Sequence, residues 1–237
     1  MKHFIGFMMV LLVLFINGCT PTGNTSEKVI GKNPILVKVW ETPKGLSVPE
    51  SVIYDPSADL LYVSNISGKP TLKNGEGFIS KVNLDGSIQN LFWVTGLNAP
   101  KGMGISGDIL YVTDIDRILA IDIPTGRVKK TWEVAEAKFL NDIAVAPSGR
   151  VYITDMVTKT LHLIDSDQLV SFLTLAYDKP NGLFMEGDTL WVGTAEGILK
   201  IDTPSKTTAM AVEHKGGIDG IKPLGDGRYI VSDWKGK

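Results

Sequence analysis

The stretch KPNGLFMEGDTLWVGT, residues 179–194, decides the fold of this 237-residue chain. It holds two short apolar runs of strand character, and Gly187 and Asp188 between them are residues that tight turns favour. The stretch therefore predicts an antiparallel hairpin. Its first strand begins at an uncharged amide, Asn181, just where the apolar run starts.

Four other segments repeat this pattern. They are PESVIYDPSADLLYVSN (49–65), APKGMGISGDILYVTD (99–114), FLNDIAVAPSGRVYITD (139–155) and GIDGIKPLGDGRYIVSD (217–233). Subtracting the numbers of the equivalent second-strand residues Tyr62, Tyr111, Tyr152, Trp191 and Ile230 gives spacings of 49, 41, 39 and 39. A period of this length is typical of propeller blades.

A third and a fourth strand are predicted after the hairpins. Third strands end in a hydrophobic-Asp pair at Asp122, Asp165 and Asp202, and a fourth strand begins at Arg127. Four antiparallel strands per period of about forty residues make a propeller blade. Helical solenoids of similar period are excluded because no convincing amphipathic helix follows residue 30. The fold class is therefore all-β, a β-propeller of four-stranded antiparallel blades.

Propeller symmetry places polar residues in two concentric sets at one face. The first strand of each blade is innermost, so the residues that begin these strands surround one mouth of the central channel. This inner ring consists of Glu50, Lys101, Asn141, Asn181 and Asp219. The second strands return to the same level farther from the axis. Their ends form an outer ring of Asn65, Asp114, Asp155, Thr194 and Asp233.

Four of the five inner-ring side chains carry oxygens, which is the ligand type that a hard divalent cation prefers. Glu50 and Asp219 held together without a counter-charge would repel each other and lose hydration. A metal ion would offset that cost. The alternative is an internal salt bridge with Lys101, in which the Asn residues only cap strand ends and turns.

The segments PESVIYD, LNDIAVAPSGRVYITD, PNGLFMEGDTLWVG and IDGIKPLGDGRYIVSD resemble successive blades of the regucalcin and gluconolactonase (senescence marker protein) family. The resemblance covers nearly all of the predicted mature chain and implies a six-bladed propeller. It also implies that Glu50, Asn181 and Asp219 bind the metal, with Asn141 on the substrate side. The implied cofactor is one divalent ion, Ca²⁺ being favoured and Zn²⁺, Mn²⁺ or Mg²⁺ the alternatives.

The implied activity is hydrolysis of a lactone or related ester. Asp219 would serve as base and Asn141 as a second catalytic residue beside the metal. Phe139 stands where sugar-lactone members of the family often carry Arg, so the sequence departs from the sugar-binding pattern. Lys101 is a candidate to orient a substrate carboxylate, or it repels the metal or points to solvent. The rival function is a non-catalytic, NHL-like propeller that acts as a surface binding module.

The N-terminus has the pattern of an exported lipoprotein. Lys2 and the apolar run 4–16 form a signal peptide over residues 1–18, and Ile16 to Cys19 resemble a lipobox. Lipidation of Cys19 would anchor the protein in the cell envelope through residues 19–33 as a tether, and an ordinary cleaved signal is the alternative. Cys19 is the single cysteine, so an intramolecular disulfide is excluded.

Residues 34–237 are predicted to form the propeller domain, and we expect a monomer that contacts the membrane through its lipid alone. The formal net charge of −2, with scattered basic residues, argues against binding to nucleic acid. About four and a half blades are present, and residues 35–40 are predicted as an outer strand that closes the ring. We therefore expect the reading frame to continue for about sixty to seventy residues beyond Lys237.

Overall fold

The computed structural model describes residues 11–12, 37–225 and 227–234. All the regular secondary structure assigned to these residues is β-strand. The sheets are four complete blades, one hairpin and a short paired segment. The first blade consists of β2 Pro49–Asp55, β3 Leu60–Asn65, β4 Gly77–Asn83 and β5 Ile88–Leu97, and the second of β6 Pro100–Ser106, β7 Ile109–Asp114, β8 Arg117–Asp122 and β9 Arg127–Glu133. The third blade consists of β10 Leu140–Val145, β11 Val151–Asp155, β12 Thr160–Asp165 and β13 Gln168–Thr174. The fourth consists of β14 Leu183–Glu186, β15 Thr189–Gly193, β16 Gly197–Asp202 and β17 Thr208–Glu213. The hairpin consists of β18 Ile218–Gly225 and β19 Arg228–Asp233, and β1 Leu11–Leu12 pairs with β19.

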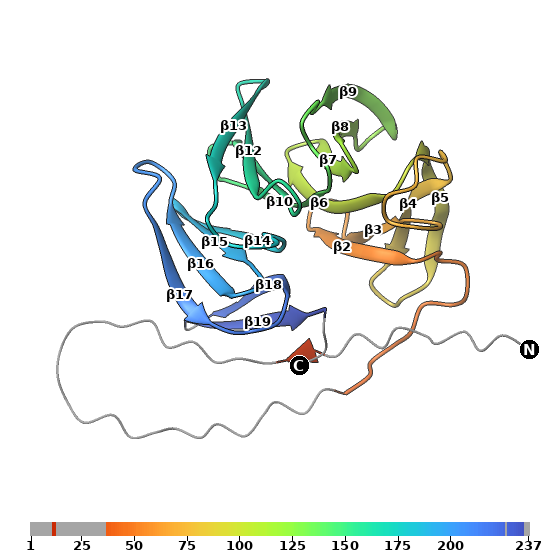
Figure 1. Cartoon of the computed structure of the whole chain (residues 1–237). Helices are drawn as coiled ribbons and strands as arrows, with labels where there is room; N and C mark the ends of the chain where they lie inside the picture. Colours follow the sequence, from red (N-terminus) through yellow and green to blue (C-terminus); the bar gives the residue numbers. More distant parts are fainter. Residues whose placement is uncertain (1–10, 13–36, 226, 235–237) are drawn as a thin grey trace, which may run out of the picture.

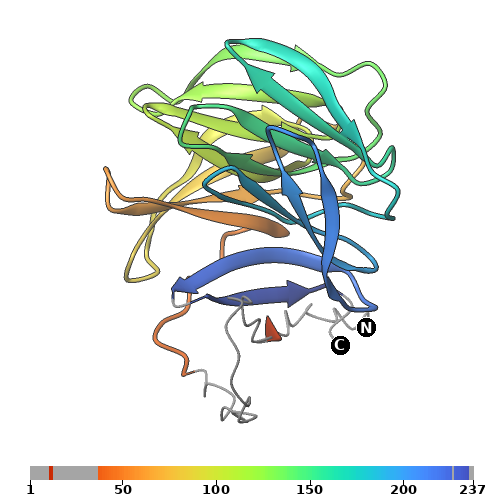
Figure 2. The ribbon, with the colours of Figure 1, turned by 90° about the vertical axis from the view of Figure 1, so that its left-hand side faces the viewer.

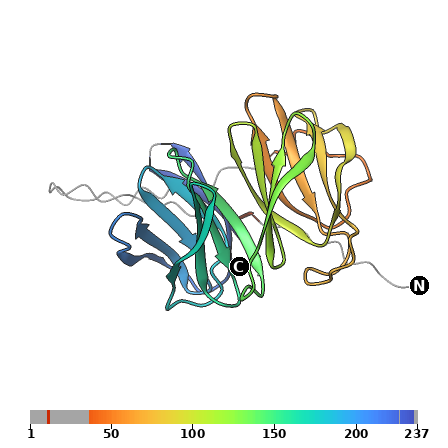
Figure 3. The ribbon, with the colours of Figure 1, turned by 90° about the horizontal axis from the view of Figure 1, so that it is seen from above.

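Each complete blade is a meander of four antiparallel strands in chain order. Figure 1 shows the five sheets following one another around a common centre, with β2, β6, β10, β14 and β18 nearest to it. In Figure 2 the β18–β19 hairpin runs below the other blades. Figure 3 shows the orange and yellow blade and the blue strands on opposite sides of the molecule. The predicted all-β propeller of four-stranded blades is confirmed, as are the third-strand ends at Asp122, Asp165 and Asp202.

The apolar core has four main clusters, one for each contact between neighbouring blades, and a small fifth cluster of Ile66, Ala99 and Ile115. Tyr62 and Ile79 of the first blade pack with Leu110 and Val112 of the second. Three further clusters join the second blade to the third, the third to the fourth, and the fourth to the β18–β19 hairpin. Strands with both faces covered supply most of these side chains, as in β11, where all five residues are buried. The blades are therefore held in sequence by shared apolar contacts.

The prediction of a strand at residues 35–40 is wrong for the part of it that the structure describes. Residues 37–40 are outside any strand, and the side chains of Val37 and Val39 are 75% and 87% exposed. Their alternating pattern has no neighbouring strand to pair with, whereas Trp40 packs over Gly86 in the turn between β4 and β5. An alternating pattern of apolar residues therefore did not suffice to predict a strand, because a strand also needs a neighbouring strand to pair with.

Apart from Leu11 and Leu12, the predicted signal peptide 1–18 lies outside the described residues, and so do Cys19 and the tether 19–33. The described part of the chain has no helix of the length and hydropathy that a membrane span requires.

Candidate functional site

The innermost strands begin with bulges that place the inner-ring residues. On β10, Asn141 and Asp142 together face the single residue Thr154 of β11. The same two-against-one pairing occurs at the start of β2, β6 and β18, where it holds Glu50, Lys101 and Asp219. A bulge bends its strand and redirects a side chain, which is why bulges are frequent beside functional sites.

Hydroxyl side chains satisfy the backbone groups that the bulges leave unpaired. The N–H of Asp142 donates to Oγ1 of Thr154 at 3.0 Å. That hydroxyl donates in turn to the carbonyl oxygen of Asn181 in the next blade at 2.9 Å. Matching bonds run from the N–H of Ser51 to Ser64 and from the N–H of Gly220 to Ser232, at 3.0 and 2.8 Å. Thr113, opposite the bulge of β6, likewise donates to the carbonyl oxygen of Asn141 at 2.5 Å. The bulges are therefore fixed features of the fold, and two of them are tied to the neighbouring blade.

Four of the five inner-ring residues line one cavity of about 390 Å³, namely Glu50, Asn141, Asn181 and Asp219. They come from four different blades, as propeller symmetry predicts. Asp142 and Lys222 also line this cavity, and the remaining walls are mainly apolar side chains such as Val52 and Met103. The structure thus brings the predicted metal ligands and the predicted substrate-side Asn141 to one place.

Asn181 has a buried oxygen without a partner. The residue is 6% exposed, and Oδ1 accepts no hydrogen bond from the part of the chain that the structure describes. The amide donates to the carboxylate of Asp219, which lowers the pKa of that acid against the larger effect of burial. Burial without a partner is costly for an amide oxygen. An oxygen of this kind beside two acids is suited to bind a cation.

The acids of the cavity disfavour each other's charge. Desolvation raises the pKa of Glu50, and the nearby charges of Asp219 and Asp142 raise it further, while Lys101 acts in the opposite direction. The side chain of Glu50 is also exposed to solvent at the cavity, which weakens these effects. Burial likewise raises the pKa of Asp219. Because ionisation of these carboxyl groups is disfavoured, the electrostatics of the site favour binding of a cation.

Asp142 is a site residue that the sequence analysis missed. Its Oδ2 accepts the backbone N–H of Leu183 in the next blade at 2.7 Å, and Oδ1 accepts the N–H of Ile143 at 2.8 Å. Burial raises the pKa of Asp142 to about 6, although these bonds and the charge of Lys222 act against the increase. Asp142 therefore fixes the geometry between the third and fourth blades and adds negative charge to the cavity.

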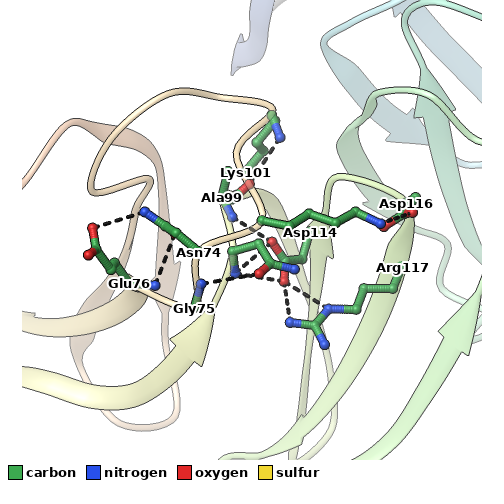
Figure 4. A network of polar contacts seen from close by, with 10 residues as sticks. Asn74, Gly75, Glu76, Ala99, Lys101, Asp114, Asp116 and Arg117 are labelled. Atoms are coloured by element: carbon green, nitrogen blue, oxygen red, sulfur yellow. Dashed lines mark hydrogen bonds and ion pairs between the residues drawn. The ribbon is translucent and has the colours of Figure 1, made fainter.

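Lys101 is buried and is not one of the residues that line the cavity. Its side chain is fully buried, and Nζ donates to the carbonyl oxygen of Ala99 at 3.0 Å (Figure 4). The same Nζ lies 4.4 Å from the centre of the Phe139 ring. Burial lowers the pKa of Lys101, whereas the charges of Glu50 and Asp114 favour its protonated form. The sequence alternative in which Lys101 points to solvent is therefore wrong.

The outer-ring residues cap the loops that lead into the inner strands. Asp114 accepts the backbone N–H groups of Asn98 and Ala99 and pairs with Arg117 at 2.7 Å (Figure 4). Asp155 accepts the N–H groups of four residues, Lys138, Phe139, Val157 and Thr158. Asn65, Thr194 and Asp233 accept further loop N–H groups. These side chains hold the loops, and their oxygens are already occupied.

No group of three or more His, Cys, Asp and Glu side chains is placed to hold a metal within the described ranges. The predicted ligand set has only two acids, Glu50 and Asp219, and its third member is the amide of Asn181. Neither His162 nor His214, the two histidines among the described residues, lines the cavity. His214 is half-buried and bonded to Asp233 at 3.0 Å, and His162 is buried within the third blade.

The comparison with known proteins identifies the fold. Neither the protein-family models nor the curated proteins compared with the chain give a match. Among solved structures, virginiamycin B lyase from Staphylococcus aureus superposes with a TM-score of 0.60 at 20% identity, over 79% of this chain and 64% of the lyase. The inactive H270A form of that lyase with quinupristin gives 0.56 at 15% identity, over 81% and 79%.

A third similar structure is the β-propeller domain of Myceliophteria thermophila Cps50 (Swd1), with a TM-score of 0.59 at 14% identity over 78% of this chain and 62% of that one. The chain thus spans less than two thirds of the first lyase structure and of the Swd1 domain. At these identities the likenesses establish the β-propeller fold. The resemblance to the regucalcin and gluconolactonase family continues to rest on the sequence motifs.

Proposed function

We propose that the protein is a metal-dependent hydrolase of lactones or related esters, with the ion held by Glu50, Asn181 and Asp219 at the mouth of the central cavity. The observation that carries this proposal is the buried, unpartnered Oδ1 of Asn181 beside two acids that disfavour each other's charge. A divalent cation with oxygen ligands fits this donor set. When bound, such an ion polarises an ester carbonyl and makes a water more acidic.

The side chains of the cavity have distinct parts in hydrolysis. The carboxylate of Asp219, whose pKa is raised by burial, accepts a proton from water as the water oxygen bonds to the acyl carbon. The same proton then passes to the alkoxide as the acyl carbon–oxygen bond of the ring breaks. The product is one hydroxy acid, and no oxidant or reductant is consumed.

Asn141 and Asp142 support this chemistry from the third blade. Asn141 is 4% exposed and lines the cavity beside Asn181, so its amide can orient the ester oxygen. The carboxylate of Asp142 accepts the N–H of Leu183 and so ties the strand that carries Asn141 to the next blade. The hydroxy acid loses its proton in water, and the negative charges of Glu50, Asp142 and Asp219 then disfavour its retention, which helps product release.

The test is metal binding and lactone hydrolysis by the purified protein and two matched variants. Asp219→Asn removes an acid of the site, and Asp165→Asn makes the same change at an exposed position paired with Arg150. We expect Ca²⁺ to raise the melting temperature of the parent and of Asp165→Asn but not of Asp219→Asn. Hydrolysis of δ-valerolactone should depend on the ion and fall at least about 100-fold in Asp219→Asn.

The same experiment separates the enzyme from its rival. A parent protein that neither binds a divalent ion nor hydrolyses any lactone would contradict the proposal. The non-catalytic, NHL-like binding module would then be the better account of the chain.

A further inference from the structure

A second cavity of about 360 Å³ adjoins the polar one. Ile53, Met103 and Lys222 line both cavities, so the two spaces meet. The polar cavity is bordered by the first residues of β2, β6 and β10, and the second cavity by their later residues. Because these strands are the innermost strands of successive blades, the second cavity continues the first along the axis of the propeller.

The second cavity is lined by apolar side chains at one repeated position. Tyr54, Ile105, Val145 and Met185 occupy equivalent places in four blades, since they pair with Leu61, Leu110, Val151 and Leu190 of the respective second strands. The inner-ring residues stand four positions earlier in the chain, and of these Glu50 on β2, Asn141 on β10 and Asn181 just before β14 line the polar cavity. The lining therefore changes from polar side chains at the inner ring to apolar side chains farther along the axis.

Lys222 is the one charged side chain lining the second cavity among the described residues. It is exposed, and its positive charge favours the ionised form of Asp142. A lysine stem commonly covers apolar surface while its ammonium group stays at a polar edge. Lys222 thus marks the boundary between the two cavities and leaves the far lining apolar.

A polyhydroxylated substrate has few partners in this channel. Lys101 is a buried cation that lines neither cavity, and its Nζ contacts the carbonyl oxygen of Ala99 and the ring of Phe139. Sugar hydroxyl groups placed against Ile105, Val145 and Met185 would lose their hydrogen bonds to water. Phe139 stands where sugar-lactone members of the resembled family often carry Arg, and this difference agrees with an apolar lining.

We infer that the substrate is a lactone or ester that carries an apolar chain, with the ester at the inner ring and the chain along the axis toward Met185. This inference rests on the proposed function and names its substrate class. Four residues separate the inner ring from the Tyr54 level, but the bulges place two of them opposite one, so the span is three residue steps, or about 10 Å at 3.3 Å per residue. That length suits a chain on the order of eight carbon atoms.

The first measurement is a series of lactones that share the reacting ring. We expect kcat/KM to rise from δ-valerolactone to δ-decanolactone by about fourfold for each added methylene group, because each leaves water for the apolar cavity. Glucono-δ-lactone should react more slowly than δ-valerolactone. Equal rates across the series, or the fastest rate with glucono-δ-lactone, would overturn the inference.

The second measurement places a charge in the channel. Met185→Glu should lower kcat/KM for δ-decanolactone at least tenfold and leave that for δ-valerolactone within threefold. Val128→Glu, at an exposed position of β9, is the matched control and should change neither. Met185 and Ile105 each pack partly against a core cluster, Met185 between the third and fourth blades and Ile105 between the first and second. Ile105→Thr, which introduces no charge, therefore serves as a milder second variant with the same expected direction.

Titration calorimetry with 1-decanol separates failure of this inference from failure of the proposed function, since decanol has no ester to hydrolyse. We expect the parent to bind decanol at least tenfold more tightly than 1-butanol, and Met185→Glu to lose that difference. Decanol binding without any lactone hydrolysis would refute the proposed function and keep the apolar ligand class. Lactone hydrolysis without chain-length dependence or decanol binding would refute the inference alone.

Discussion

The inner and outer rings contain similar residues and differ in what those residues contact. Asp114 and Asp155 of the outer ring accept several backbone N–H groups each, so their charge is compensated. Glu50 and Asp219 of the inner ring face each other across a cavity, and Asn181 keeps a bare oxygen. Repetition of a polar residue in every blade therefore marks structure in the outer ring, and in the inner ring it marks the residues to which we assign the proposed function.

The largest effect is expected from loss of an outer-ring carboxylate. Asp114→Ala leaves two loop N–H groups and the partly buried Arg117 without their acceptor, and should lower the free energy of unfolding by about 3–5 kcal/mol. Urea unfolding measures this change. The control Asp116→Ala, which breaks a surface pair with Lys73, should cost about 0–1 kcal/mol. Equal losses in both variants would contradict a capping role for Asp114.

A matched pair of Asn variants tests the two rings directly. Asn181→Leu removes the unpartnered oxygen and also the bond that the amide donates to Asp219, so it should reduce divalent-ion affinity at least about 100-fold while lowering the free energy of unfolding by only about 1 kcal/mol. Asn65→Leu should do the reverse, because it removes bonds to Ser47, Val63 and Ser80 and costs about 1–3 kcal/mol or more. Calorimetry and urea unfolding supply the two readouts. If the metal affinity fell in both variants, the proposed difference between the inner and outer rings would be contradicted.

A smaller effect is expected where the rings meet. Thr154→Val removes the hydroxyl that joins the N–H of Asp142 to the carbonyl of Asn181, and should lower the free energy of unfolding by about 1–3 kcal/mol. Thr160→Val on the same blade removes only a long local bond of 3.4 Å to Thr158 and should be nearly neutral. If urea unfolding gives the same result for both variants, the hydroxyl bridge does not couple the blades.

The subtlest difference is in the pH dependence of the metal-free protein. A raised pKa means that the folded state binds a proton more tightly than the unfolded state, so the contribution of Glu50 to stability is complete below its ordinary pKa and declines as pH rises through the raised value. Glu50→Gln does not titrate. Its free energy of unfolding relative to the parent should therefore increase from pH 5 to pH 9, as followed by urea unfolding in a chelator. A difference that shrinks with pH would show that Glu50 is stabilised as the anion.

The sequence predicted the blades well because hairpin pattern and period are local signals. The third strands end where the hydrophobic-Asp pairs predicted, and β9 begins at Arg127. Residues 37–40 failed because strand formation also needs a neighbour. In the site, symmetry sufficed to gather Glu50, Asn141, Asn181 and Asp219 into one cavity.

Asp142 and the hydroxyl contacts were missed because a bulge cannot be read from alternation. Two residues occupy the space of one, so either Asn141 or Asp142 could have been assigned to the cavity, and the structure assigns both. A signal was nevertheless present. Four second strands end with a hydroxyl residue directly before the outer-ring residue, in the pairs Ser64-Asn65, Thr113-Asp114, Thr154-Asp155 and Ser232-Asp233.

The division of the apolar core among blade contacts has a consequence for cooperativity. Each cluster belongs to two sheets, so no sheet completes a core by itself, and the free energy of folding resembles a sum of nearest-neighbour couplings along a one-dimensional array. Strands of the second, third and fourth blades, such as β8, β11 and β15, take part in two couplings each. Within the described blades, their amides should exchange with deuterium more slowly than those of strands that take part in one coupling.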